Sequence, residues 1–222
     1  MHAGAAGRRF DAVVFDNDGL LLDTEESWTR AERELFERRG IVFTPEHKRE
    51  LLGTSAKAAA ASLEVMLDAA GRGPLLIAEL AMLVLEEMRH YAAPRPGARE
   101  LLERLRAASI PAALASNSPR ILVERALETA AIPQRTFAAI LTADSVAVPK
   151  PAPDIYLAAC AALGTEPART LALEDSPTGV AAAVAAGCFT VGVPSMDGIE
   201  LAQAAFVAPS LVAPSIIAAL GL

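Results

Sequence analysis

The stretch VVFDNDGLLLDTEE, residues 13–26, places two carboxylates one residue apart directly after a short apolar run. The run is rich in β-branched and aromatic residues and is followed by turn-forming ones, a pattern that predicts a buried strand. Asp16 and Asp18 then lie where that strand ends. Two like charges so close repel each other unless a cation or a proton lies between them. The stretch therefore predicts a chemical site at the end of the first strand.

The rest of the chain alternates strand-length apolar runs with helical patterns. Strands are expected at 11–15, 110–115, 138–143, 170–173 and 188–193, and helices at 97–108, 119–130, 153–163 and 177–186. Such alternation predicts an α/β fold, a Rossmann-like parallel sheet with helices on both faces. The last 22 residues carry no charge. Two prolines divide them into blocks too short to span a membrane, so a final strand and a closing helix are expected there.

One long segment departs from this alternation. From about residue 25 to residue 91 every periodic stretch has a helical pattern, and the strand–helix alternation resumes only after PRPG at 94–97. We therefore expect a small all-helical domain inserted after strand 1. The predicted division is a disordered lead-in at 1–9, an α/β core made of 10–23 and 93–222, and a helical domain at 24–92.

Composition restricts the class of protein. Of the 222 residues 53% are hydrophobic and 21% charged, which indicates a globular chain. The net charge of −7 argues against nucleic-acid binding, and no segment is expected to enter a membrane. Cys160 and Cys188 each lie in an apolar run, as expected for buried thiols in a reducing compartment. We therefore expect a cytoplasmic protein. The expected oligomeric state is a monomer or a weak homodimer.

Polar residues follow four of the predicted strands. Ligands of open parallel sheets bind beyond the carboxyl ends of the strands, so these residues are expected at one edge. Ser118 and Ser176 each precede a proline and are expected to cap the helices that follow. The other candidates at this edge are Asp16, Asp18, Ser116, Asn117, Lys150, Glu174 and Asp175.

The types of residue at this edge favour one chemistry over its rivals. An EF-hand calcium loop is excluded, because Leu20 and Leu21 occupy positions that need an oxygen ligand and a glycine. No glycine-rich turn for a dinucleotide follows strand 1, and all three histidines lie outside the four loops. Oxygen ligands alone indicate Mg²⁺, and a lysine with hydroxyl and amide donors suits a phosphoryl group.

Four motifs in order then resemble the haloacid dehalogenase superfamily, in the branch of β-phosphoglucomutase and phosphoglycolate-phosphatase-like enzymes. They are FDNDGLLLDTE at 15–25, ASNS at 115–118, the lysine of PKPAPDIY at 149–156, and LEDSPTGVAAAVAAG at 173–187. The resemblance runs from about residue 11 to residue 208, and the helical insert lies where this branch carries its cap domain.

The resemblance implies a role for each residue at the edge. Asp16 would be the nucleophile, and Asp18 the general acid and base. Ser116, Asn117 and Lys150 would hold the phosphoryl oxygens. Mg²⁺ would be bound by Asp16, the backbone carbonyl of Asp18 and Asp175, with Glu174 as a ligand or water-holding neighbour.

The function so implied is a Mg²⁺-dependent phosphatase. Its substrate would be a small phosphorylated metabolite, either a sugar phosphate or a phosphoglycolate-like acid. Dehalogenases of the superfamily lack the second aspartate, so Asp18 favours phosphoryl transfer. A phosphomutase with the same residues is the alternative, and a non-catalytic binding protein on the same fold is a weaker one.

The helical insert would select the substrate. Its segment 52–57, LGTSAK, resembles the cap loop that faces the active site in this branch. Thr54, Ser55 and Lys57 are the specificity candidates. Ala56 stands where β-phosphoglucomutase-like proteins often have arginine, which argues against a phosphoglucose mutase. Trp28 is expected to pack inside the cap.

Overall fold

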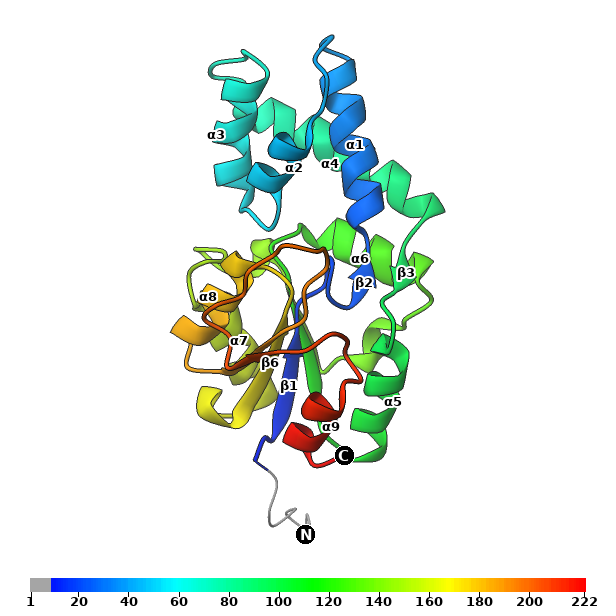
Figure 1. Ribbon diagram of the computed structural model, residues 1–222, viewed down its shortest axis with the longest axis vertical. Helices are drawn as coiled ribbons and strands as arrows, with labels where there is room; N and C mark the ends of the chain where they lie inside the picture. Colours follow the sequence, from blue (N-terminus) through cyan, green and yellow to red (C-terminus); the bar gives the residue numbers. More distant parts are fainter. Residues whose placement is uncertain (1–8) are drawn as a thin grey trace.

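The computed structural model describes residues 9–222 (Figure 1). Most of the predicted disordered lead-in, 1–9, lies outside the described residues. Arg9 is described, and its guanidinium lies 4.1 Å from the centroid of the Phe189 ring. The side chain of residue 9 therefore packs on the core.

A six-stranded sheet forms the centre of the molecule. Its order is β5-β4-β1-β6-β7-β8, and neighbouring strands pair in parallel. The strands are β1 (Ala12–Phe15), β4 (Ala112–Ala115), β5 (Ala139–Leu141), β6 (Thr170–Glu174), β7 (Phe189–Gly192) and β8 (Phe206–Val207). Each residue of β1, β4 and β6 is buried, as expected for strands covered on both faces. The predicted α/β class is confirmed.

Helices cover both faces because the side chains of a strand alternate in direction. Val13 and Phe15 belong to one buried apolar cluster, which includes residues of α5, α6 and α9. Val14 belongs to the other cluster, with residues of α7 and α8. The core helices are α5 (Ala98–Ala107), α6 (Arg120–Thr129), α7 (Asp154–Leu163), α8 (Pro177–Ala185) and α9 (Pro214–Leu220), with 3₁₀ turns at Gln134–Thr136, Ala143–Ser145 and Pro167–Arg169.

Four further helices lie together beyond the sheet, at the top of Figure 1. They are α1 (Glu25–Glu37), α2 (Pro45–Leu51), α3 (Ala56–Met66) and α4 (Gly73–His90). Helix α4 packs against α1 and α3, and it also contacts α6 of the core. The chain enters and leaves this region through β2 (Leu22–Asp23) and β3 (Ala93–Pro94), which pair antiparallel.

The two predicted serine caps have different outcomes. Ser176 caps α8, since its hydroxyl accepts a hydrogen bond from the backbone N–H of Gly179 at 3.0 Å. The prediction for Ser118 is wrong: Asp144 accepts the hydrogen bond of the Arg120 N–H at 2.7 Å. The reason is that Pro119 takes the capping position of α6, and the Ser118 hydroxyl turns toward the sheet edge instead.

The uncharged C-terminal segment forms β8 and α9, as predicted. Ile216 and Leu220 of α9 are buried in the core. Among residues 9–222, no helix has the length and apolar character needed to cross a membrane.

Candidate active site

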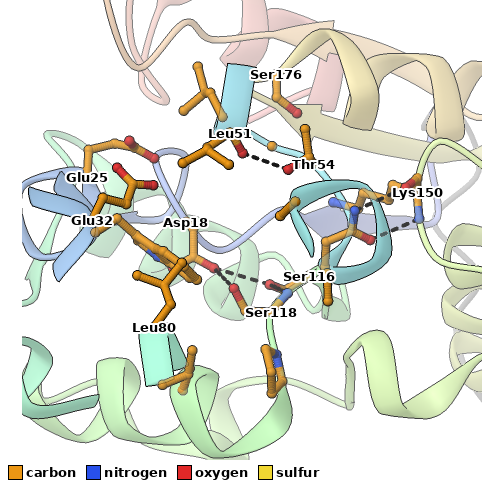
Figure 2. A pocket seen from close by; sticks show the side chains of 18 of the residues that line it. Asp18, Glu25, Glu32, Leu51, Thr54, Leu80, Ser116, Ser118, Lys150 and Ser176 are labelled. Atoms are coloured by element: carbon orange, nitrogen blue, oxygen red, sulfur yellow. Dashed lines mark hydrogen bonds between the residues drawn. The ribbon is translucent and has the colours of Figure 1, made fainter. Parts of the chain in front are cut away.

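A cavity of about 130 Å³ lies between the carboxyl edge of the sheet and the helices α1 to α4 (Figure 2). Core residues on its wall include Asp16, Asp18, Ser116, Asn117, Lys150 and Asp175, and residues from the helices above include Glu25, Trp28, Glu32, Lys48, Leu51, Thr54 and Leu80. All the core residues predicted at the sheet edge line this cavity, except Glu174, which is fully buried behind it.

Lys150 joins the ends of two strands. Its Nζ lies 2.6 Å from Oδ1 of Asp16, after β1, and 2.6 Å from Oε1 of Glu174, at the end of β6. The lysine side chain is only 3% exposed. The two carboxylates raise the pKa of Lys150, so the ammonium stays charged despite its burial.

The backbone of Lys150 is held by Asn117. The Asn117 amide donates to the Lys150 carbonyl at 3.1 Å and accepts from the Lys150 N–H at 2.9 Å. Its side chain is therefore committed to this loop. The backbone N–H of Asn117 has no hydrogen-bond partner among the described residues, and it is the donor that Asn117 can offer to a ligand.

Three buried carboxylates meet at the base of the cavity. Asp16, Glu174 and Asp175 each offer an oxygen, and these oxygens lie within 4.8 Å of one another. Burial, together with the charges of Glu174 and Asp18, raises the pKa of Asp16 to about 8 although Lys150 opposes the shift. Burial and the charge of Asp16 raise the pKa of Asp175 well above its usual range.

The donor set fits a hard divalent cation. The single charge of Lys150 leaves the three carboxylates undercompensated, and Oε2 of Glu174 is buried without a hydrogen-bond partner. Gly19, with φ of +81°, gives Asp175 room: a Cβ there would lie 2.2 Å from Oδ2 of Asp175. This buried acidic cluster could therefore bind a metal ion, and its ligands are all oxygen.

Asp18 is held apart from this cluster by hydroxyl donors. Its Oδ1 accepts from Thr24 at 2.8 Å, and its Oδ2 accepts from Ser118 at 2.8 Å and from Ser116 at 3.2 Å. Trp28 adds its indole N–H at 3.5 Å. Figure 2 shows the bonds from both serines converging on one end of the carboxylate. Asp18 therefore lies on the cavity wall, oriented by four donors.

Several of these partners were not predicted from the sequence. Tyr156, fully buried on α7, donates its hydroxyl to Oε1 of Glu174. Thr24 and Ser118 orient Asp18, although Ser118 resembled a helix cap. Trp28 was expected to pack within the helical region, yet it lines the cavity and reaches Asp18. The place of Tyr156 near the start of α7 could be read from PKPAPDIY, because it lies two residues after Asp154. Its hydrogen bond to Glu174 could not.

The three specificity candidates of the helical region differ in their positions relative to the cavity. Thr54 lines the cavity, and its hydroxyl donates to the Leu51 carbonyl at 2.8 Å. Ser55 caps α3, accepting from the Ala58 N–H at 3.3 Å. Lys57 is exposed and is not among the residues that line the cavity. The lysine of the helical region that does line the cavity is Lys48, on α2, which was not predicted from the sequence.

Residues 10–187 match the family model of the haloacid dehalogenase-like hydrolases. The chain belongs to this family. The match spans the four motifs and the helical insertion, so the predicted superfamily is confirmed together with its class, a hydrolase.

Several curated relatives of this hydrolase are named phosphatases. It is 34% identical to validoxylamine A 7'-phosphate phosphatase of Streptomyces hygroscopicus subsp. limoneus over 196 residues, covering 88% of this chain and 91% of the relative. It is 30% identical to hexitol phosphatase B of Escherichia coli, covering 86% of each.

Among solved structures, the hydrolase is similar to CbbY from Rhodobacter sphaeroides in complex with phosphate. The TM-score is 0.83 at 30% identity, with 96% of this chain and 100% of CbbY covered. A mutant of that CbbY has been solved in complex with xylulose-(1,5)bisphosphate. These likenesses extend over the helical region as well as the core.

Proposed function

We propose that this hydrolase is a Mg²⁺-dependent phosphatase that cleaves a sugar phosphate or similar small phosphate monoester through an aspartyl phosphate. The observation that carries the proposal is the convergence of Lys150, Asp16 and Asp18 on one cavity. The names of its curated relatives support the same reaction class.

In the first half-reaction Asp16 attacks phosphorus, and the bond from phosphorus to the leaving oxygen breaks. Asp18 protonates that oxygen, which departs as an alcohol. Lys150, the Ser116 hydroxyl and the Asn117 backbone N–H hold the phosphoryl oxygens as charge develops. The Ser116 hydroxyl turns from Asp18 to the substrate for this, while Ser118 and Thr24 continue to hold Asp18. In the second half-reaction Asp18 takes a proton from water, which attacks phosphorus. The bond from phosphorus to Asp16 breaks, phosphate leaves, and both aspartates return to their starting states.

Asp16, Asp175 and the backbone carbonyl of Asp18 would hold Mg²⁺, with Glu174 beside them. The ion would neutralise charge on the phosphoryl oxygens and on the three carboxylates. Glu174 already shares one oxygen between Lys150 and Tyr156, and its other oxygen has no partner. Its part is to fix the lysine, and it would also be a ligand of the ion or hold a water beside it.

The helices at 24–92 act in this proposal as a cap domain over the core of 10–23 and 93–222. Support comes from the cavity, whose wall is shared between the two regions. Closure of a cap excludes water from the aspartyl phosphate until the leaving group has departed. The expected cytoplasmic location, the monomer or weak homodimer, and the absence of a nucleic-acid partner remain parts of the same proposal.

The decisive experiment measures phosphate release from a panel of phosphorylated sugars and small acids, with Mg²⁺ and with EDTA. Wild type, Asp16→Asn and the exposed loop variant Asp197→Asn are compared. We expect release that needs Mg²⁺, is abolished in Asp16→Asn and is retained in Asp197→Asn. Release that persists in Asp16→Asn contradicts the nucleophile. Isomerisation in the presence of a bisphosphate, without release, identifies a phosphomutase instead.

A further inference from the structure

The cavity has a second charged group that the proposed reaction does not use. Lys48 of α2 lies 3.0 Å from Oε2 of Glu32 and 3.1 Å from Oε2 of Glu25, both on α1. We call Glu25, Glu32 and Lys48 the distal acid cluster. All three line the cavity, and Figure 2 shows the two glutamates on the opposite side of Asp18 from Lys150.

The cluster has no net positive charge. Two carboxylates share one ammonium, so its formal charge is −1 when every group is ionised. Burial raises the pKa of Glu32 to about 7, and protonation there brings the cluster to neutrality. Lys48 and Lys150 are the only basic side chains among the lining residues that the structure describes, and each lies between two carboxylates. At Lys150 the proposed Mg²⁺ would add positive charge, whereas no further basic side chain of the described cavity wall adds any at Lys48. An anionic group at this end would therefore meet a cluster without net positive charge.

The cluster does have acceptor capacity. Oε2 of Glu25 is buried and makes no hydrogen bond of good geometry, although Lys48 is near. Trp28 lies between the glutamates in the sequence, and the spacings of three and four residues place all three on one face of α1. Leu51 and Leu80 add apolar wall nearby. The far end of the cavity therefore combines carboxylate acceptors with an indole and aliphatic surface.

Resting on the phosphatase function proposed above, we infer that the distal acid cluster selects phosphate monoesters whose far end carries hydrogen-bond donors, and rejects those that end in a second phosphate or a carboxylate. Hydroxyl and ammonium groups supply the same chemistry to Glu25, and both count as ligands of the cluster. A substrate of this kind is bound by its phosphoryl group at Lys150 and by its donors at α1. A bisphosphate would bring its second phosphate against the carboxylate of Glu25, and against that of Glu32 where Glu32 is ionised, a repulsion that a cavity of low dielectric strengthens.

The test compares kcat/KM for four compounds: glucose 6-phosphate, glucosamine 6-phosphate, 6-phosphogluconate and fructose 1,6-bisphosphate. The selectivity is the ratio of kcat/KM for the donor-ended compounds to that for the anionic ones. We expect a ratio of about 10 or more in wild type, since a tenfold ratio needs only one modest interaction. The two donor-ended compounds separate hydroxyl from ammonium recognition.

Glu25→Gln removes one negative charge with little change of shape, and Glu26→Gln does the same one residue away. Glu26 is exposed, pairs with Arg30 and is absent from the cavity wall. We expect Glu25→Gln to lower the ratio about fivefold or more, mainly through KM for the anionic compounds, and Glu26→Gln to leave it within about twofold. A purely structural role for Glu25 would lower every kcat/KM equally and leave the ratio unchanged.

A wild-type preference for the anionic compounds overturns the inference, and so does an unchanged ratio in Glu25→Gln. The wild-type ratio needs no variant, so a misfolded Glu25→Gln does not protect the inference. Phosphate release with the wrong selectivity refutes only the inference, whereas release from no phosphate ester at all overturns the proposed function as well.

Discussion

The side-chain amide of Asn117 bonds both backbone groups of Lys150, at 3.1 Å through its nitrogen and at 2.9 Å through its oxygen. This pair fastens the lysine loop to the end of β4, next to the strand that carries Asp16. The position of the ammonium is thus fixed from the backbone outward, before any ligand enters. Both the lysine and the asparagine can be tested separately.

Lys150→Met removes the cation that lies between Asp16 and Glu174. We expect kcat/KM to fall about 10²–10³-fold, as for the loss of one preorganised donor to a developing oxyanion. Steady-state phosphate release measures this. The matched control is Lys57→Met, which alters an exposed lysine outside the cavity and is expected to change kcat/KM less than about twofold. A comparable loss in Lys57→Met would show that Lys57 contributes to activity, as first expected of it as a specificity candidate.

Glu32 gives the stability of the protein a dependence on pH. Burial raises the pKa of Glu32 from 4.5 to about 7, so between these values the folded chain binds more protons than the unfolded chain. The free energy of unfolding therefore falls as pH rises through this window, by up to about 3 kcal/mol for this group. Denaturant titration at pH 5, 6, 7 and 8 measures the slope.

In Glu32→Gln this contribution is absent, so the difference in stability between wild type and variant should change across the window and level off above about pH 7. Glu34→Gln, which alters an exposed carboxylate paired with Arg38, is the control and should run parallel to wild type. Parallel curves for Glu32→Gln and wild type would show that Glu32 titrates normally in the folded state.

Gly19→Ala tests the close approach at the acidic cluster. The residue has φ of +81°, and a Cβ would lie 2.2 Å from Oδ2 of Asp175, so Asp175 must move. We expect loss of metal binding by calorimetry and of metal-dependent turnover. Gly40→Ala is the control, because Gly40 has φ of +69° with open space around it. That change should cost only the backbone strain, about 1–2 kcal/mol. Normal metal binding in Gly19→Ala would contradict the assignment of Asp175.

Asn17→Val should stabilise the fold. Asn17 is fully buried, and neither its amide nitrogen nor its oxygen has a hydrogen-bond partner within residues 9–222. A buried polar group without a partner costs about 1–3 kcal/mol, so removing it should raise the free energy of unfolding by that order. Asn117→Val removes an amide that is hydrogen-bonded through both its nitrogen and its oxygen, and it should destabilise the fold. Thermal unfolding of both variants decides, and a destabilised Asn17→Val would reveal an unseen partner.

The sequence predicted which distant residues meet at the sheet edge better than it predicted the hydrogen-bond partners of those residues. Asp16, Lys150 and Glu174 are up to 158 positions apart, yet each lies at or beyond the carboxyl end of a parallel strand, and parallel strands bring their carboxyl ends to one edge. Topology alone therefore places them together. The meeting of the three carboxylates of the acidic cluster could thus be predicted without knowledge of side-chain packing.

Packing decided what the sequence could not. Lys48 lies in PEHKREL, a charged helix that suggests a solvated surface, yet its side chain is only 12% exposed because it meets Glu25 and Glu32 of α1. Ser118 precedes a proline as a cap would, but it is Asp144, from the 3₁₀ turn at Ala143–Ser145, that accepts the hydrogen bond of the Arg120 N–H at the start of α6. Strands β2 and β3 have two residues each, too few for any periodic pattern.

That short pair of strands has a consequence for the history of the fold. Leu22 pairs with Pro94 and Asp23 with Ala93, so the 69 residues at 24–92 leave the core and return to it at neighbouring points. Doubling the length of a segment that closes such a gap costs only about 0.6 kcal/mol. An exchange of the segment 24–92 would therefore change the residues above the cavity while Asp16 and β1 stay in place. The substrate could then change during evolution without a change in the reaction.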